Sequence, residues 1–290
     1  MVLGDLTDAK DYHPAELVNR IVREFSKLSE VVDNIYILKG NHDQLKEGSM
    51  FFAFLDELPN VKVITRPTEV GDGEALCYFL PYSRNPGTEW ASLDFSHYDY
   101  LFLHQTVRGA VASNGQEMDG EALPSLNAAK VYSGDIHVPQ IAGAVEYVGS
   151  PYHVHFGDAF VPRCVAIQRD RRAFDLNFET TRRLSLKLEG RAGIVRLRDV
   201  ASATTQAKVT VRLSRAEAHE WQAIRREVIE ACLASRIELC GLKLEVEKPA
   251  GKAGTRPRRC AVDPGEAMYR YVDADGLGGD LLDIGLEIME

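Results

Sequence analysis

The chain has 290 residues, of which 45% are hydrophobic and 27% charged, values typical of a globular protein with a substantial core, so disorder throughout is excluded. Its net charge is −9, so it does not hold nucleic acid by an overall positive surface, and any DNA contact is expected to be local or supplied by a partner. No apolar run approaches the ~20 residues that cross a bilayer, and the N-terminus lacks a signal peptide, so a cytoplasmic protein with no membrane partner is expected.

The first part of the chain alternates apolar strand patterns with helical ones. Val2-Leu3-Gly4-Asp5 is typical of the end of a buried strand, and apolar residues at helical spacing follow over 14–28. The later patterns predict strands at 34–38, 61–64, 76–80, 98–103, 131–133, 145–148 and 164–168, and a helix at 51–58. This order predicts a layered α/β architecture with flanking helices.

The last third of the chain has a different pattern. Residues 208–213 and 242–247 alternate like half-buried strands, and a helical stretch at 216–234 lies between them, which predicts a compact β-α-β unit. Residues 249–259 are rich in Gly, Pro, Lys and Arg and indicate a linker, and apolar residues after position 264 need another surface for packing. We therefore expect three regions: 1–181, 182–248 and 249–290.

The five cysteines are odd in number, widely spaced and without a Cys-x-x-Cys pair. This spacing favours reduced thiols over a disulfide framework or a zinc finger.

Four polar clusters directly follow predicted strands. Ligands usually bind at the strand ends of an α/β sheet, because loops there bring polar side chains together. The clusters are Gly4-Asp5-Leu-Thr-Asp8, Gly40-Asn41-His42-Asp43, His104-Gln105 and Gly134-Asp135-Ile-His137. Asp, Asn and His offer oxygen and imidazole ligands without thiolate, which suits Mn²⁺, Fe²⁺, Mg²⁺ or Zn²⁺. Two such ions ~3.5–4 Å apart are one route to phosphoester cleavage, so hydrolysis of a phosphoester is the expected reaction.

The ordered motifs resemble those of the calcineurin-like metallophosphoesterases. The stretches Leu103-His-Gln-Thr106, Tyr132-Ser-Gly-Asp-Ile-His-Val-Pro-Gln140 and Tyr147-Val-Gly-Ser-Pro151 are similar to the SbcD-type nucleases of double-strand-break repair and their phage relatives. The motifs cover about two thirds of the chain, and the β-α-β unit resembles that family's capping domain. The resemblance implies a layered β-sandwich metallophosphoesterase fold over 1–181 and a small capping domain over 182–248.

The resemblance also implies two divalent metal ions, with Mn²⁺ expected, and their ligands. Asp5 would bridge the ions, Asn41, His104 and Asp135 would complete the second site, and His137 would belong to the first. The family usually has His where Asp135 stands. Asp can likewise ligate a metal ion, through an anionic carboxylate oxygen.

Two further residues carry implied catalytic roles. His42 would face the scissile phosphate and donate to its oxygen or to the leaving group, while Asp8 would hold the imidazole through its other nitrogen.

The family's opening Asp-x-His motif has no counterpart ahead of Gly4-Asp5. Three explanations stay open: a misplaced translation start, a natural truncation that keeps one ion, or replacement by His13, His153 or His155. The first is favoured, because a missing opening strand would also leave an unpaired edge in the sheet. This polypeptide is accordingly expected to hold at most one ion tightly.

Structural roles compete with each functional one. Asp5 and Asp8 suit the start of a helix, His104 suits a buried strand end, and Asp135 and His137 suit a polar turn. His13, His97 and His219 are expected to be surface or packing residues. His153 and His155 would share one face in a strand and line the cleft, with an exposed loop as the equal alternative.

The resemblance implies a metal-dependent DNA nuclease subunit, with exonuclease and endonuclease activity, in double-strand-break repair or recombination. It further implies a homodimer bound to an SbcC-type coiled-coil ATPase, with residues 267–290 as the docking segment. Two alternatives remain: a catalytically impaired scaffold or DNA-binding subunit of the same complex, and a phosphatase of the same fold.

Overall fold

The computed structural model describes residues 1–46, 49–71, 75–121, 123, 125–177, 179–200 and 205–247. Met1–Val246 form one compact unit, the first of two into which the chain divides. The linker and the partner-binding segment expected over 249–290 lie outside the described residues. The boundary expected near residue 181 falls within the first unit and stays a prediction.

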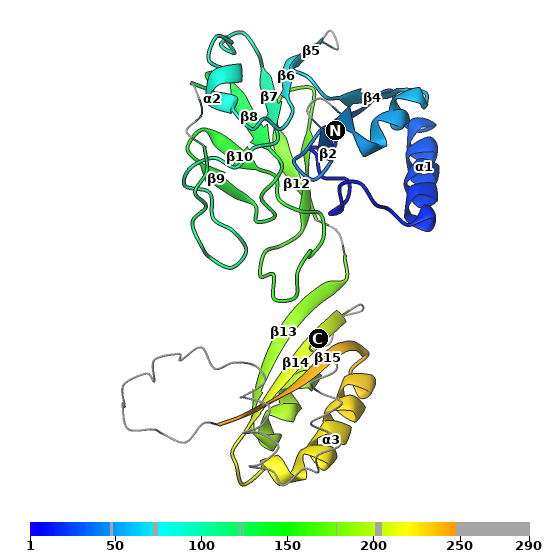
Figure 1. The fold of residues 1–290 in the computed structure, drawn as a ribbon, viewed down its shortest axis with the longest axis vertical. Coiled ribbons are helices and arrows are strands. Elements are labelled where there is room, and N and C mark those ends of the chain that lie inside the picture. The colour runs from blue at the N-terminus through cyan, green and yellow to red at the C-terminus, as the bar shows by residue number, and fades with distance from the viewer. Residues whose placement is uncertain are drawn as a thin grey trace, which may run out of the picture. The chain divides into compact units, whose positions relative to one another are not determined.

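A six-stranded mixed sheet forms the centre of the first part of the chain, in the order β5-β6-β7-β8-β10-β9 (Figure 1). Its strands are β5 (Thr68–Gly71), β6 (Leu76–Leu80), β7 (Tyr100–Leu103), β8 (Lys130–Ser133), β9 (Gln140–Ala142) and β10 (Val145–Tyr147). β6, β7 and β8 run parallel, and Leu80 pairs with Leu103, which pairs with Ser133. The carboxyl ends of these three strands therefore lie at one edge of the sheet.

A second layer of strands packs against this sheet. β1 (Ile35–Leu38) and β4 (Val61–Ile64) are parallel, Val2 forms a parallel bridge to Ile37, and β11 (Arg163–Ile167) forms a hairpin with β12 (Ala173–Asn177). The core between the layers contains Phe79, Phe102 and Tyr132 from neighbouring strands, whose rings stack at 5.1 and 5.9 Å. Side chains of β1, β4 and β11 reach the same core. The expected layered α/β arrangement is confirmed.

Helices and loops cover the outer faces. α1 (Ala15–Ser29) and η1 (Phe51–Glu57) pack on β1 and β4, and Figure 1 shows α1 on the far side of β4 from β7 and β8. The helix expected over 14–28 is confirmed, whereas the segment at 51–58 forms a 3-10 helix. The other face of the six-stranded sheet packs on Trp90, Phe95 and their neighbours, next to the short helix α2 (Pro86–Glu89). A small hairpin, β2 (Gln44–Lys46) with β3 (Ser49–Met50), completes this part.

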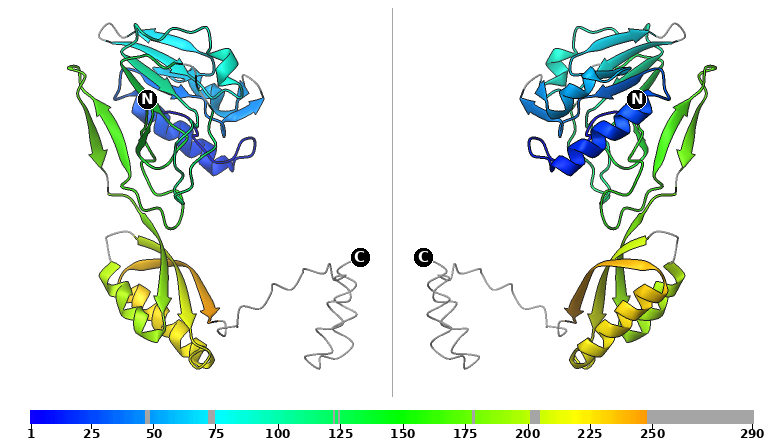
Figure 2. Two further views of the ribbon diagram at one scale, coloured as in Figure 1. Left: turned by 90° about the vertical axis from the view of Figure 1, so that its left-hand side faces the viewer. Right: turned by 90° about the vertical axis from the view of Figure 1, so that its right-hand side faces the viewer.

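The last described part is a three-stranded parallel sheet with one helical face (Figure 2). Its elements are β13 (Arg182–Glu189), η2 (Arg191–Val200), β14 (Thr205–Leu213), η3 (Ala218–Glu220), α3 (Trp221–Ala234) and β15 (Ile237–Val246). Alternate residues of β14 are buried in a separate core with side chains from η2 and α3. The expected β-α-β unit is present, and β13 extends it by a strand that the sequence did not predict.

Cys77, Cys164, Cys232 and Cys240 are free thiols, as expected, and Cys260 lies outside the described residues. None of the helices in the described ranges has the length and apolar character needed to span a membrane.

Candidate metal centre

Three predicted ligands meet at the carboxyl edge of the central strands. Asp5 follows the bridge residue Val2, His104 follows β7, and Asp135 follows β8. One ligand atom from each of these three residues lies within 4.8 Å of the others. The parallel pairing of β7 with β8 explains why His104 and Asp135, far apart in the chain, become neighbours.

His104 is at the centre of this cluster and is fully buried. Its Nδ1 donates to the carbonyl oxygen of Leu3 at 2.6 Å. Its Nε2 lies 3.3 Å from Asp5 Oδ2, 3.4 Å from Asn41 Oδ1 and 3.7 Å from Asp135 Oδ1. A hydrogen bond on one ring nitrogen fixes the tautomer that presents the other nitrogen to a metal ion. All four residues expected around the second ion are therefore close together.

Electrostatics couple His104 to the two carboxylates. Burial acts to lower the pKa of His104, but the hydrogen bond to Asp5 and the charges of Asp5 and Asp135 outweigh it and raise the pKa to about 9. Burial likewise acts to raise the pKa of Asp5, yet His104 and the backbone N–H of His42 hold that pKa below its ordinary value. The proton on His104 Nε2 thus supplies positive charge beside the carboxylates of Asp5 and Asp135, as a bound cation would.

The backbone at the site is held in uncommon conformations. Asp5 has φ of 56° and Asp135 has φ of 75°, in the left-handed region that residues other than glycine rarely adopt. Thr106 Oγ1 donates to Asp135 Oδ2 and fixes this side chain from the neighbouring loop. Strained backbone that surrounding contacts maintain is typical of functional sites.

Asp43 organises the loops that carry the ligands. Its Oδ2 accepts from the backbone N–H of Asp5 at 2.7 Å and of Gly40 at 2.8 Å, and its Oδ1 accepts from Leu6 N–H at 3.1 Å. Burial, together with the charge of Asp5, raises the pKa of Asp43. The sequence indicated no role for Asp43, although this residue closes the Gly-Asn-His-Asp motif.

His42 lies beside the cluster on the same loop as Asn41. Its backbone N–H donates to Asp5 Oδ1 at 2.9 Å. Its Nδ1 lies 2.7 Å from the carbonyl oxygen of Asp8 and 3.4 Å from the Asp8 carboxylate, which is fully exposed. Asp8 therefore contacts the imidazole at Nδ1, more closely through its main-chain carbonyl than through its carboxylate.

His137 lies outside the group of three ligands and next to His155, with ring centroids 5.6 Å apart. Burial and the charge of His155 lower the pKa of His137, and the charges of Asp158, Asp5 and Asp135 act in the opposite direction. His137 is thus close enough to the cluster to sense its charge.

Of the two alternatives for His153 and His155, the structure has the loop and not the shared strand face. His153 is buried, with Nε2 2.9 Å from the carbonyl oxygen of Phe160, whereas His155 is exposed. Asp158 Oδ2 fixes this loop by accepting from the backbone N–H groups of Val154 and His155. Of these two histidines, His155 is therefore the one that could share a ligand with His137, because their rings lie side by side.

The other histidines have packing or surface positions. The centroid of the His13 ring lies 4.3 Å from that of Phe51, and the centroid of the His97 ring lies 4.1 Å from that of Tyr98. The side chain of His219 is 75% exposed. None of the three joins the described ligand cluster.

The donor set fits a divalent cation. Two carboxylates, an amide oxygen and an imidazole nitrogen converge, and the second nitrogen of the imidazole is already anchored. This mixture of hard oxygen and nitrogen donors is suited to Mn²⁺, Fe²⁺, Mg²⁺ or Zn²⁺.

Comparison with curated proteins finds a similarity to a phage protein. The protein "Exonuclease subunit 1" of Enterobacteria phage T4 is 26% identical over 170 residues, which cover 55% of this chain and 49% of that protein. The chain therefore spans about half the length of the curated relative it matches. No family model matches the sequence.

Proposed function

We propose that this chain is a metal-dependent nuclease subunit that hydrolyses phosphodiester bonds in DNA. The observation that carries the proposal is the convergence of Asp5, His104 and Asp135 at the ends of the central strands, beside His42. Distant similarity to a phage exonuclease subunit supports DNA as the substrate. Both exonuclease and endonuclease action, in repair or recombination, belong to the proposal.

Asp5, Asn41, His104 and Asp135 would hold one divalent ion, with Mn²⁺ proposed. His137, with His155 beside it, is the candidate for a second. When bound, such ions neutralise the phosphate oxygens and lower the pKa of the attacking water. Asp5 is suited to a bridging role, because its Oδ2 faces His104 while its Oδ1 accepts from His42 N–H.

His42 would act on the substrate directly. Its Nδ1 faces the carbonyl oxygen of Asp8, which orients the ring and leaves Nε2 for the phosphate. Protonated at Nε2, the ring would donate to a phosphate oxygen or to the leaving oxygen. Asp8 is a positioning residue in this proposal.

The test is cleavage of linear duplex DNA with Mn²⁺ by the wild type and by His42→Ala. We expect the variant to lose at least about a hundredfold in rate, the usual contribution of a positioned acid or base. His219→Ala is the matched control, because that side chain is exposed and outside the cluster. Binding of DNA without any cleavage would favour the scaffold alternative, and cleavage of generic phosphodiesters but not DNA would favour a phosphatase.

A partner also belongs to the proposal. The phage relative is named as a subunit, which supports a complex. We propose an SbcC-type coiled-coil ATPase as the partner of a dimer of this chain, docked by residues 267–290. Co-purification of the ATPase with the full chain, but not with a chain ending near residue 250, is the direct test.

A further inference from the structure

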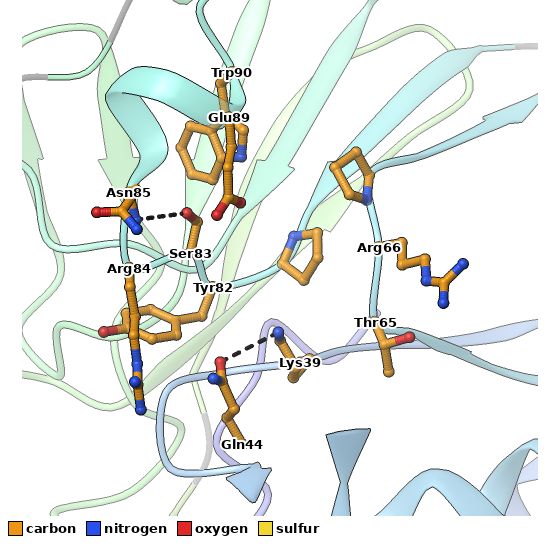
Figure 3. Close-up of a pocket in the computed structure, with 12 residues that line it drawn as sticks. Lys39, Gln44, Thr65, Arg66, Tyr82, Ser83, Arg84, Asn85, Glu89 and Trp90 are labelled. Carbon is orange, nitrogen blue, oxygen red and sulfur yellow. Dashed lines mark hydrogen bonds between the residues drawn. The ribbon is translucent and has the colours of Figure 1, made fainter. Parts of the chain in front are cut away.

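A cavity of about 370 Å³ is lined by residues that follow β1, β4 and β6 (Figure 3). Among the described residues that line it, the charged ones are Lys39, Arg66, Arg84 and Glu89, three cations and one carboxylate. The chain as a whole has a net charge of −9, so the sign of the charge reverses locally. A cavity with charge of one sign concentrates ligands of the opposite sign.

The inner wall of the cavity is fixed by hydrogen bonds. Lys39 is 5% exposed, and its Nζ lies 3.3 Å from Gln44 Oε1. The carbonyl oxygen of Lys39 accepts from Tyr82 N–H at 2.9 Å, and Ser83 Oγ accepts from Asn85 N–H at 2.9 Å. Figure 3 shows Lys39 and Gln44 on one wall and Ser83, Asn85 and Glu89 on the other. The buried Lys39 side chain is therefore held in place by its surroundings.

Arg66 and Arg84 are exposed residues that line the same cavity. A guanidinium presents a planar fork of donors that matches phosphate, and long exposed side chains can adjust to a ligand. These two side chains provide two adaptable cations to the cavity.

Two lining residues of the cavity are sequence neighbours of residues at the candidate metal centre, and a third is hydrogen-bonded to such a neighbour. Lys39 directly precedes Gly40-Asn41, and Gln44 directly follows Asp43. Ser83 N–H donates to Gln105 Oε1 at 3.4 Å, and Gln105 follows His104. The cavity is therefore lined by neighbours of Asn41 and Asp43, and one lining residue is hydrogen-bonded to the residue after His104.

We infer that this cavity binds a nucleotide phosphate adjacent to the phosphodiester that is cut. That the ligand is DNA rests on the proposed function. That it is a phosphate rests on the cationic residues of the cavity itself. The volume lies within the ~300–1,000 Å³ range of ligand pockets. The phosphate belongs either to the bound strand or to a released mononucleotide.

The test uses the full chain in EDTA, so that metal-dependent cleavage is suppressed. Binding of a short fluorescein-labelled single-stranded oligonucleotide is followed by fluorescence anisotropy across a salt series. We expect Arg66→Gln with Arg84→Gln to raise the Kd about tenfold, equivalent to ~1.4 kcal/mol. The slope of log K against log salt should fall by about 0.7 for each phosphate that the variant no longer neutralises.

Two further variants make the test specific to the cavity. Arg20→Gln removes one positive charge, against two in the double variant, from the exposed face of α1 and should leave the Kd within about twofold. Glu89→Gln removes the one carboxylate among the described lining residues and should lower the Kd, opposite in sign to the arginine variants. Near-ultraviolet and far-ultraviolet circular dichroism establishes that each variant is folded.

Competition with deoxyadenosine monophosphate and inorganic phosphate distinguishes a phosphate of the bound DNA strand from that of a released mononucleotide. Displacement of the oligonucleotide by the mononucleotide at millimolar concentration supports product binding, and weaker competition supports the strand. The inference is overturned if the double variant binds DNA with the Kd and salt slope of the wild type. If the wild type neither binds nor cuts DNA, yet the arginines are still required to bind the mononucleotide, the proposed function fails and the phosphate site stands.

Discussion

At the scale of single residues, the candidate site depends on a carboxylate that we do not propose as a metal ligand. Asp43 is 2% exposed and accepts from three backbone N–H groups, which belong to Asp5, Leu6 and Gly40. A buried donor without its acceptor costs free energy, because water cannot replace the bond. Asp43 therefore joins the two loops that carry Asp5 and Asn41.

We predict that Asp43→Ala lowers the free energy of unfolding by about 2–4 kcal/mol, because three backbone donors are left without their acceptor. Urea denaturation measures this change. Asp94→Ala is the matched control, since Asp94 also accepts from a backbone N–H but is exposed, and it should cost less than about 1 kcal/mol. Equal destabilisation of the two variants would contradict the role of Asp43.

His104 gives the metal-free protein a defined pH dependence. Its pKa in the folded protein, about 9, exceeds its ordinary value of 6.5. The stability contributed by protonated His104 is thus fully present below pH 6.5 and is lost as the pH rises through about 9.

The same shift affects ion binding. A cation at Nε2 must displace the proton, so we predict that Mn²⁺ binding near neutral pH releases about one proton and tightens as the pH rises towards 9. Calorimetry in two buffers with different ionisation enthalpies counts the released protons. Binding without proton release would show that His104 is already neutral or is not a ligand.

At the scale of secondary-structure elements, the ends of separate strands meet so closely that only glycine fits between them. A Cβ on Gly40 would overlap Asp5 Oδ1 and lie 2.6 Å from Asp5 N and 2.8 Å from His104 Cε1. Gly40 therefore allows the loop after β1 to pass beside Asp5 and the loop after β7.

Gly40→Ala should displace Asp5 and weaken Mn²⁺ binding by about tenfold or more, the usual effect of disturbing the support of a metal ligand. Isothermal titration calorimetry or manganese electron paramagnetic resonance measures the affinity. Gly71→Ala is the control, because among the described residues its Cβ would meet only Leu76 Cδ1, at an ordinary contact distance of 3.7 Å. If Gly40→Ala binds Mn²⁺ as tightly as the wild type, the close approach does not define the site.

At the scale of the whole molecule, the described residues form cores that do not share side chains. The sheet of β13, β14 and β15 packs with η2 and α3 around its own apolar cluster, whereas the strand layers before it enclose other clusters. A separate core is the physical basis of a separate domain.

We predict that Leu213→Ala, at a fully buried position in the core of the three-stranded sheet, costs about 2–5 kcal/mol in that region alone. Differential scanning calorimetry should resolve two transitions, of which only one shifts. Lys243→Ala, on an exposed side chain of the same sheet, is the control. A single transition that shifts as a whole would contradict the expected boundary near residue 181.

The sequence by itself determined the α/β class, most of the strands of the first part, and the four polar clusters. Strand patterns such as 76–80 and 131–133 record local burial, and polar residues after them indicate strand ends, so both follow from short-range information. The motif order further indicated which clusters act together.

Only the tertiary structure decided which side chains actually meet. His153 and His155 differ in burial because their loop is shaped by Asp158, a contact that periodicity does not encode. The role of Asp43 and the cationic cavity likewise depend on residues from separate loops. Strand pairing sets these distances, and pairing is a long-range property that arises only when the layers pack together.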